Sequence, residues 1–351
     1  MKRTRSRWHE GWDAGGSRPS RRSGARASFL LGAAALALTV SGCTSSIDSF
    51  APVTDRGHDN LWLLNLSFIL ITAVMLLVFG VLGYSIVRFR NRTPSEREGN
   101  SRLEIFWTAT PALLLVVLFI LSVRTMNTIT TGHDAGDVVT IKAVGNQWWW
   151  AFDYPDLGIT TANELHVPTD RPVRIELEST DVIHSFWVPQ LGWKLDMIPG
   201  RTNVMNFTVD TPGTFDGACA EFCGAQHAWM RLKVIASPGD QFAAWSSQQA
   251  AAASTPSDLV AKDGEATFLR ESCAACHTVK GTAAQGKVGP DLTHFGSRET
   301  IGAGVLQNTP ANLEAWLRDP QAYKPGIVMP GFDRLSDEQI RALVEYLEGL
   351  K

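Results

Sequence analysis

The apolar and polar residues of the chain follow three different patterns from the N-terminus to the C-terminus. In the first part, two long runs without charge occupy residues 61–87 and 105–123. As helices they would be about 40 Å and about 28 Å long, close to or beyond the ~30 Å hydrocarbon core of a bilayer. We therefore predict a transmembrane helical hairpin over residues 61–124.

Between residues 133 and 236 the pattern changes to the alternation of β-strands. Val173, Ile175 and Leu177 fall on one face of such a strand, and β-branched residues recur through the region. Pro and Gly punctuate the short runs. Several short strands in about 100 residues predict a β-sandwich or Greek-key barrel.

The C-terminal third carries helical signals. Residues 237–257, rich in Ala, Ser and Gln, are interpreted as a linker. Beyond them, Thr309 before Pro310 is typical of a helix start, and Ser336 with Gln339 matches a capping box. Residues 258–351 are therefore predicted to form a small all-α domain.

The distribution of charge orients the hairpin. The formal net charge of the chain is −3, which argues against a nucleic-acid-binding protein. The segment between the apolar runs is basic, with Arg88, Arg90, Arg92, Arg97 and Arg102. A basic loop favours the cytoplasmic side, so both folded domains are expected outside a bacterial plasma membrane that the chain crosses more than once. Two buried core helices, the alternative, would leave this bias unexplained.

The N-terminus resembles an export signal of the lipoprotein type. Basic residues precede a short apolar run, and Val40-Ser41-Gly42-Cys43 matches a lipobox. Residues 1–42 are predicted to be removed, Cys43 to be lipidated, and residues 43–60 to form an extracytoplasmic segment. The alternative is an uncleaved anchor, but the apolar run of about 12 residues is short for a span.

Two cysteine pairs carry the candidate chemistry, and Cys219 and Cys223 form the first. Exported cysteines usually form disulfides. Here His227 and Met230 follow closely, and thiolate, imidazole and thioether together form a soft ligand set that favours copper over zinc. A copper site in a β-sandwich also needs a histidine from a distant strand. His184 follows a β-run and is well placed; His166 competes with it, and His133 is close to the membrane helix.

The second pair lies in Cys273-Ala-Ala-Cys276-His277, the attachment pattern of a c-type haem. Two thioether bonds and an axial imidazole would hold the haem. The sixth ligand of an electron-transfer haem at high potential is commonly a methionine, and Met329 is the candidate. His294 is the alternative ligand, and loop packing is the alternative role for Met329.

Residues 61–235 resemble subunit II of cytochrome c oxidase, on the copper motif together with Gln147-Trp148-Trp149-Trp150 and Pro199-Gly200-Arg201. The resemblance implies a dinuclear copper centre, CuA, with both thiolates bridging the two metals. It implies as ligands His184, Cys219, the carbonyl of Glu221, Cys223, His227 and Met230. It also implies a magnesium ion shared with subunit I through the side chain of Glu221.

The same resemblance assigns roles to residues outside the copper site. Trp148 would be an electron-entry aromatic residue, although adjacent tryptophans near a membrane usually serve packing or an interfacial belt. Glu104 would stand at the mouth of a proton channel into subunit I, although a charge at a helix end often only snorkels. An aromatic shell expected to keep the copper dry consists of Phe186, Trp187, Phe222 and Trp229.

Residues 258–351 resemble class I cytochromes c, in which a proline carbonyl, here that of Pro290, orients the axial histidine. Together the resemblances imply the electron-transfer subunit of a cytochrome c oxidase. A donor cytochrome c or cytochrome bc complex would reduce the haem, and electrons would pass through CuA to haem a and CuB in subunit I. Oxygen reduction and proton translocation would occur there, with subunit III as a further partner.

Three other functions share some of these features. Nitrous oxide reduction also uses CuA but needs a His-rich catalytic domain. Quinol-oxidising relatives lack the copper ligands that this chain has. A membrane-tethered copper carrier would not need a covalent haem.

Overall fold

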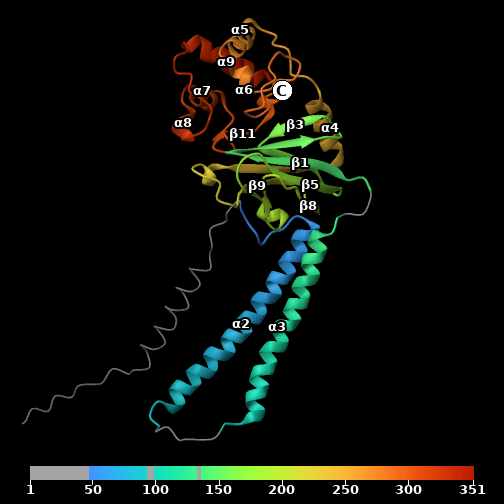
Figure 1. Cartoon of the computed structure of the whole chain (residues 1–351), viewed down its shortest axis with the longest axis vertical. Helices are drawn as coiled ribbons and strands as arrows, with labels where there is room; N and C mark the ends of the chain where they lie inside the picture. The colour runs from blue at the N-terminus through green and yellow to red at the C-terminus, as the bar shows by residue number, and fades with distance from the viewer. Residues whose placement is uncertain (1–46, 93–98, 133–135) are drawn as a thin grey trace, which may run out of the picture. The chain divides into compact units, whose positions relative to one another are not determined.

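The computed structural model describes residues 47–92, 99–132 and 136–351. In chain order they form two long helices, a β-sandwich and a helical domain (Figure 1). The predicted signal peptide, 1–42, and the lipidation candidate Cys43 lie outside the described residues.

The two apolar runs form the helices α2 (Asp55–Phe89) and α3 (Ser101–Thr130). Each begins at a capping side chain: Thr54 accepts a hydrogen bond from the Gly57 amide, and Asn100 accepts from the amides at the start of α3. Their most apolar stretches contain no buried side chains. Helices satisfy their own backbone hydrogen bonds, so such surfaces suit a lipid environment.

The predicted β-region forms two five-stranded sheets (Figure 1). The first has the order β3-β2-β1-β5-β8, with β1 (Val139–Asn146), β2 (Trp149–Tyr154), β3 (Ile159–Ala162), β5 (Pro172–Ser179) and β8 (Asn203–Thr208). The second has the order β4-β10-β9-β6-β7, with β4 (Glu164–Pro168), β6 (His184–Trp187), β7 (Leu195–Met197), β9 (Gly213–Cys219) and β10 (Arg231–Ser237). A short helix η1 (Pro189–Leu191) lies between β6 and β7.

The core of the sandwich follows from the alternation of its strands. Ile141 of β1 pairs in register with Ile175 of β5, and both are fully buried. Leu165 and Val234, paired between β4 and β10, are buried as well. Burying side chains of this size is worth roughly 1.5–3 kcal/mol each, so these pairs fix the register on which the copper-site residues depend.

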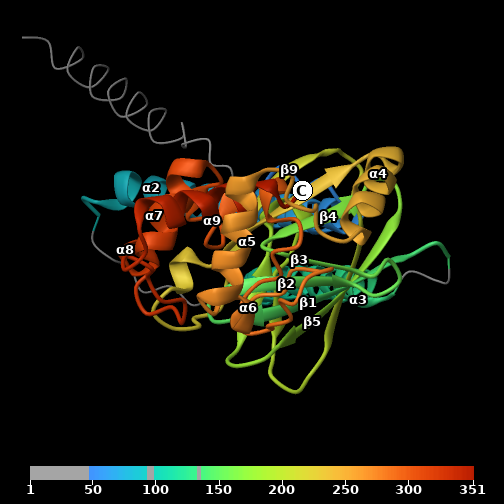
Figure 2. The same cartoon turned by 90° about the horizontal axis from the view of Figure 1, so that it is seen from above.

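Residues 237–257, interpreted as a linker, contain the helix α4 (Gly239–Ala250). The sequence did not predict this helix, which packs against β3 and β4 (Figure 2). Phe242 is buried, and the Trp245 ring stacks on that of His166 with centroids 4.2 Å apart. The two aromatic residues pack this mainly small and polar segment against the sandwich core.

The C-terminal domain is helical, as predicted. Its elements are α5 (Leu259–Arg270), α6 (Cys273–Cys276), η3 (Phe295–Ser297), β11 (Thr300–Ile301), β12 (Leu306–Gln307), α7 (Pro310–Arg318), α8 (Pro320–Tyr323) and α9 (Asp337–Gly349). Thr309 caps α7, and Ser336 with Gln339 forms the predicted capping box of α9.

Helices α5 and α9 pack closely and lie side by side in both views (Figures 1 and 2). A side chain at Gly264 of α5 would meet the Ala342 carbonyl oxygen at 2.0 Å, so this contact requires glycine. Phe268 and Tyr346 pack edge to face across the same helix pair. The packing leaves α6 at one end of a cavity.

The packing of α4 predicts a measurable contribution to stability. The substitution Phe242→Ala should lower the free energy of unfolding by about 3 kcal/mol, because it empties a buried aromatic site. Gln248→Ala on the exposed face of the same helix is the control. Denaturant unfolding of the purified chain, followed by tryptophan fluorescence, would measure both. Equal effects of the two substitutions would show that α4 does not stabilise the sandwich.

Candidate copper centre and haem cavity

The candidate metal ligands lie on a loop, residues 219–230, that we call the copper loop. It starts at the last residue of β9, contains the short helix η2 (His227–Trp229) and leads into β10. The Cys219 amide donates to the Met230 carbonyl at 2.9 Å and closes the loop at its base. The pairing of β9 with β10 thus brings residues eleven apart in the sequence together.

The soft side chains converge inside this loop. The sulfur atoms of Cys219 and Cys223 lie 3.7 Å apart, and both residues are buried. The Met230 sulfur lies 3.9 Å and His227 Nδ1 3.7 Å from the Cys223 sulfur. The Glu221 carbonyl oxygen lies 3.2 Å from the Cys219 sulfur. All cysteines within the described residues are unpaired thiols, so the disulfide alternative finds no support.

His184 completes the cluster from strand β6, which pairs with β9 beside Cys219. Its Nδ1 lies 3.9 Å from the Cys219 sulfur, and the ligand atoms of His184, Cys219 and Cys223 all lie within 4.8 Å of one another. The competitor His166 is occupied by its stack on Trp245. The geometry thus places His184, and not His166, beside the sulfur atoms of Cys219 and Cys223.

Asp181 orients His184, and the sequence reasoning missed it. Its carboxylate lies 2.8 Å from His184 Nε2, so the ring turns Nδ1 toward the sulfurs. A carboxylate on the outer nitrogen of a ligating histidine is a common second partner at metal sites. The sequence signal that could have identified Asp181 is its position three residues before His184.

The protonation of the two thiols is strongly coupled. Hydrogen bonding with Cys223, and to a lesser degree with His184, lowers the pKa of Cys219 against the opposing effect of burial. The neighbouring Cys219 sulfur and burial raise the pKa of Cys223. The loop is thus built to hold a buried thiolate, which is the form that binds metal.

The expected aromatic shell is only half present within the chain. Phe186 is buried and Trp187 partly buried, but Phe222 is 76% exposed and Trp229 44% exposed. The expectation for the last two was wrong for the isolated chain, because both lie on the outer side of the copper loop. They leave an apolar surface beside the copper ligands.

The three adjacent tryptophans have separate environments. Trp150 is fully buried in the sandwich, as packing would predict. Trp148 donates from Nε1 to the Cys223 carbonyl at 2.9 Å, and Gln147 Nε2 donates to the same oxygen at 2.7 Å. Trp149 lines a cavity of the C-terminal domain. Trp148 and Trp149 therefore connect the copper loop with that cavity.

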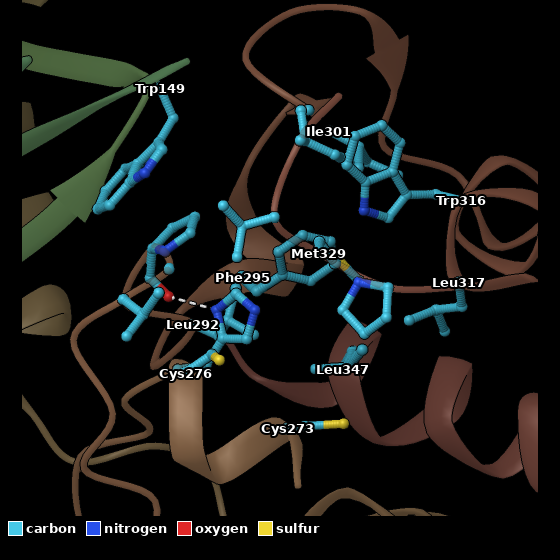
Figure 3. Close-up of a pocket in the computed structure, with 18 of the residues that line it drawn as sticks. Trp149, Cys273, Cys276, Leu292, Phe295, Ile301, Trp316, Leu317, Met329 and Leu347 are labelled. Atoms are coloured by element: carbon cyan, nitrogen blue, oxygen red, sulfur yellow. Dashed lines mark hydrogen bonds between the residues drawn. The ribbon is translucent and has the colours of Figure 1, made fainter. Parts of the chain in front are cut away.

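The cavity has a volume of about 450 Å³ and lies over α6, and we call it the haem cavity. Figure 3 shows Cys273 and Cys276 along one wall, Trp149 on another, and apolar side chains between them. His277 also lines it, with Nδ1 2.8 Å from the Pro290 carbonyl oxygen. This contact leaves Nε2 for a metal, as the resemblance to cytochromes c implied.

Met329 lines the haem cavity, and Figure 3 shows its side chain directed into it. His294, the alternative ligand, instead places Nε2 3.2 Å from the Ala251 carbonyl oxygen. The described cavity lining does not include it. The geometry therefore favours Met329 as the partner of His277.

The haem cavity fits a haem in its polar groups as well as in its size. Arg298 lines it, and Nε of this residue is buried without a hydrogen-bond partner among the described residues. Buried polar groups are rarely left unpaired, so an orphaned guanidinium nitrogen indicates a missing acceptor. A haem carboxylate would supply one. Cys273, Cys276, His277 and Met329 would hold the group.

Comparisons with known proteins agree with this architecture. Family models match residues 52–125 (cytochrome c oxidase subunit II, transmembrane domain), 158–237 (its periplasmic domain) and 261–351 (cytochrome c). Cytochrome c oxidase subunit 2 of Alkalihalophilus pseudofirmus is 39% identical over 337 residues, which cover 93% of this chain and 97% of the relative. The chain belongs to the cytochrome c oxidase subunit II family.

A second relative supports the same assignment. Cytochrome c oxidase subunit 2 of Bacillus subtilis is 37% identical over 350 residues, 92% of this chain and 97% of the relative. The crystal structure of the periplasmic domain of subunit II of cytochrome oxidase from Bradyrhizobium japonicum is 34% identical and covers 34% of this chain and 96% of that chain, with a TM-score of 0.32. The chain is thus a membrane subunit of a haem–copper oxidase, with a CuA domain and a cytochrome c domain.

The family resemblance assigns Glu104 a role in proton transfer and the side chain of Glu221 a role in magnesium binding. Glu104 is exposed in the first turn of α3, near the N-cap Asn100. Glu221 contributes its carbonyl oxygen to the surroundings of Cys219, and its side chain is partly buried. Their proposed roles in proton and magnesium binding remain predictions.

The position of Asp181 predicts a loss of copper affinity on substitution. Asp181→Ala should weaken copper binding about 10-fold to 100-fold, because His184 loses the carboxylate that orients it. Titration against a copper chelator would measure the change. Asp196→Ala, in strand β7 opposite Ser185, is the control. Unchanged affinity in Asp181→Ala would show that His184 needs no such partner.

The lining of the haem cavity predicts that Met329, and not His294, is the second axial ligand of the haem. Met329→Leu should lower the haem midpoint potential by on the order of 0.1 V, since a thioether ligand favours the reduced iron. His294→Ala should leave the potential close to that of the unsubstituted protein. Redox titration of the haem absorption would distinguish them, and the opposite pattern would make His294 the ligand.

Proposed function

We propose that this subunit receives electrons from a donor cytochrome at its cytochrome domain and delivers them through the CuA domain to subunit I, where oxygen is reduced and protons are translocated. The order from haem to copper is supported by the position of Trp148, which lines the haem cavity and hydrogen-bonds to the copper loop. Bound haem would take up single electrons from the donor, and bound copper would pass them on.

The residues of the chain prepare each centre for this task. His184, Cys219, Cys223, His227, Met230 and the Glu221 carbonyl would hold the two copper ions. Cys273 and Cys276 would attach the haem covalently, with His277 and Met329 as its axial ligands. Buried, closely packed ligands limit rearrangement and solvent access when the charge changes, which favours fast electron transfer.

The proposed membrane orientation agrees with the charge pattern. Arg88, Arg90 and Arg92 at the end of α2 favour the cytoplasm, so the other ends of α2 and α3 and both domains would lie outside. At the proposed cytoplasmic end, Glu104 of α3 would lead protons toward subunit I. The exposed apolar side chains of Phe222 and Trp229 would be covered by subunit I, beside a magnesium ion held by Glu221.

The proposed route predicts different defects when either centre is lost. With reduced donor, Cys219→Ser oxidase should keep a reducible haem but lose oxygen consumption, because the copper site lacks a thiolate. The double variant Cys273→Ala, Cys276→Ala should lose reduction of both centres by the donor. Stopped-flow spectra at the haem and near-infrared copper bands would measure this. Copper reduced at the usual rate without the haem would contradict the route.

A further inference from the structure

Lys324 is a buried cation whose place between the two domains has no role in the function proposed so far. It follows α8, is 2% exposed, and lines the haem cavity. Its ammonium donates to the Trp148 carbonyl at 2.7 Å and to the Gly302 carbonyl at 2.9 Å. One acceptor belongs to the sandwich, the other to the cytochrome domain.

A lysine in this position is costly. Among the described residues, no carboxylate lies within ion-pair distance of Lys324, and burial lowers its pKa to about 7 against the attraction of the nearby Cys223 sulfur. Moving an ammonium out of water without an ionic partner is expensive, and a neutral donor could also bind two carbonyls. A role in holding the two domains together therefore does not explain why the hydrogen-bond donor at this position is a lysine.

Trp148 is held at both of its ends. Lys324 binds its backbone carbonyl, and its indole nitrogen donates to the Cys223 carbonyl at 2.9 Å. Trp148 itself lines the haem cavity. The residue thus forms one bonded connection from the wall of the haem cavity to a copper-loop cysteine, and Lys324 fixes the cavity side of it.

We propose that Lys324 is a positioning residue for electron transfer between the two centres, because it holds Trp148 in the contact that joins the haem cavity to the copper loop. The inference rests on the proposed function and adds the group that sets the geometry of its internal step. Electron transfer falls steeply with separation and with gaps in the bonded path. Release of the Trp148 carbonyl would open such a gap.

Glu164 supplies a matched comparison, because it joins the same two domains without touching Trp148. Its carboxylate is buried in β4 and accepts from the amides of Glu299 and Thr300, at 2.9 Å and 3.0 Å, and from the Thr300 hydroxyl. Like Lys324, it binds the segment around β11. A loss that follows from weaker domain contact alone should appear in both substitutions.

The test compares Lys324→Met with Glu164→Gln in the assembled oxidase. After rapid reduction of the haem, the rate of electron arrival at copper should fall about 10-fold in Lys324→Met and stay within about 2-fold in Glu164→Gln, since small misplacements along a reacting path have large effects. Donor-to-haem rates should be unchanged in both.

The midpoint potentials of both centres, measured in each variant, separate a change in driving force from a change in the path. An unchanged haem-to-copper rate in Lys324→Met would overturn the inference, and so would an equal loss in Glu164→Gln. If Lys324→Met does not assemble, the rate in Lys324→Ala, which also lacks a donor for the Trp148 carbonyl, decides by the same criteria. Absence of haem-to-copper transfer in the unsubstituted oxidase would instead contradict the proposed function.

Discussion

Two buried thiols 3.7 Å apart impose the main constraint on this protein. The sulfur atoms can share metal ions with His184 only because the loop is closed at its base and a second strand carries the histidine to it. The pairing of β9 with β10 closes the loop, and the pairing of β6 with β9 brings His184 to it. The sandwich core, built from residues such as Ile141 and Ile175, fixes both pairings.

Polar contacts join the cytochrome domain to the sandwich. Glu164 and Lys324 are buried at the contact between sandwich and cytochrome domain, where unpaired charges would be destabilising. Each finds backbone partners in the segment around Thr300 and Gly302. The cytochrome domain is thus bound through its own haem-cavity wall, and the chain that links the domains is ordered by α4.

The features that could be predicted from the sequence are those with local signals. The apolar runs, the alternation around Ile175, the Ser336 capping box and the cysteine motifs all act over short stretches of chain, and the structure contains the corresponding elements. The helix α4 was missed because its composition is that of a linker and only its packing orders it. Asp181, Glu164 and Lys324 were missed for a related reason: their partners are defined by tertiary structure.

The central claim is that the copper loop and His184 hold two copper ions that share one unpaired electron. Electron paramagnetic resonance of the oxidised, fully assembled oxidase, combined with copper analysis, tests it most directly. The account predicts two copper ions in this subunit and hyperfine splitting from two equivalent copper nuclei. A single-copper spectrum, or a Cys219–Cys223 disulfide in the active complex, would contradict it.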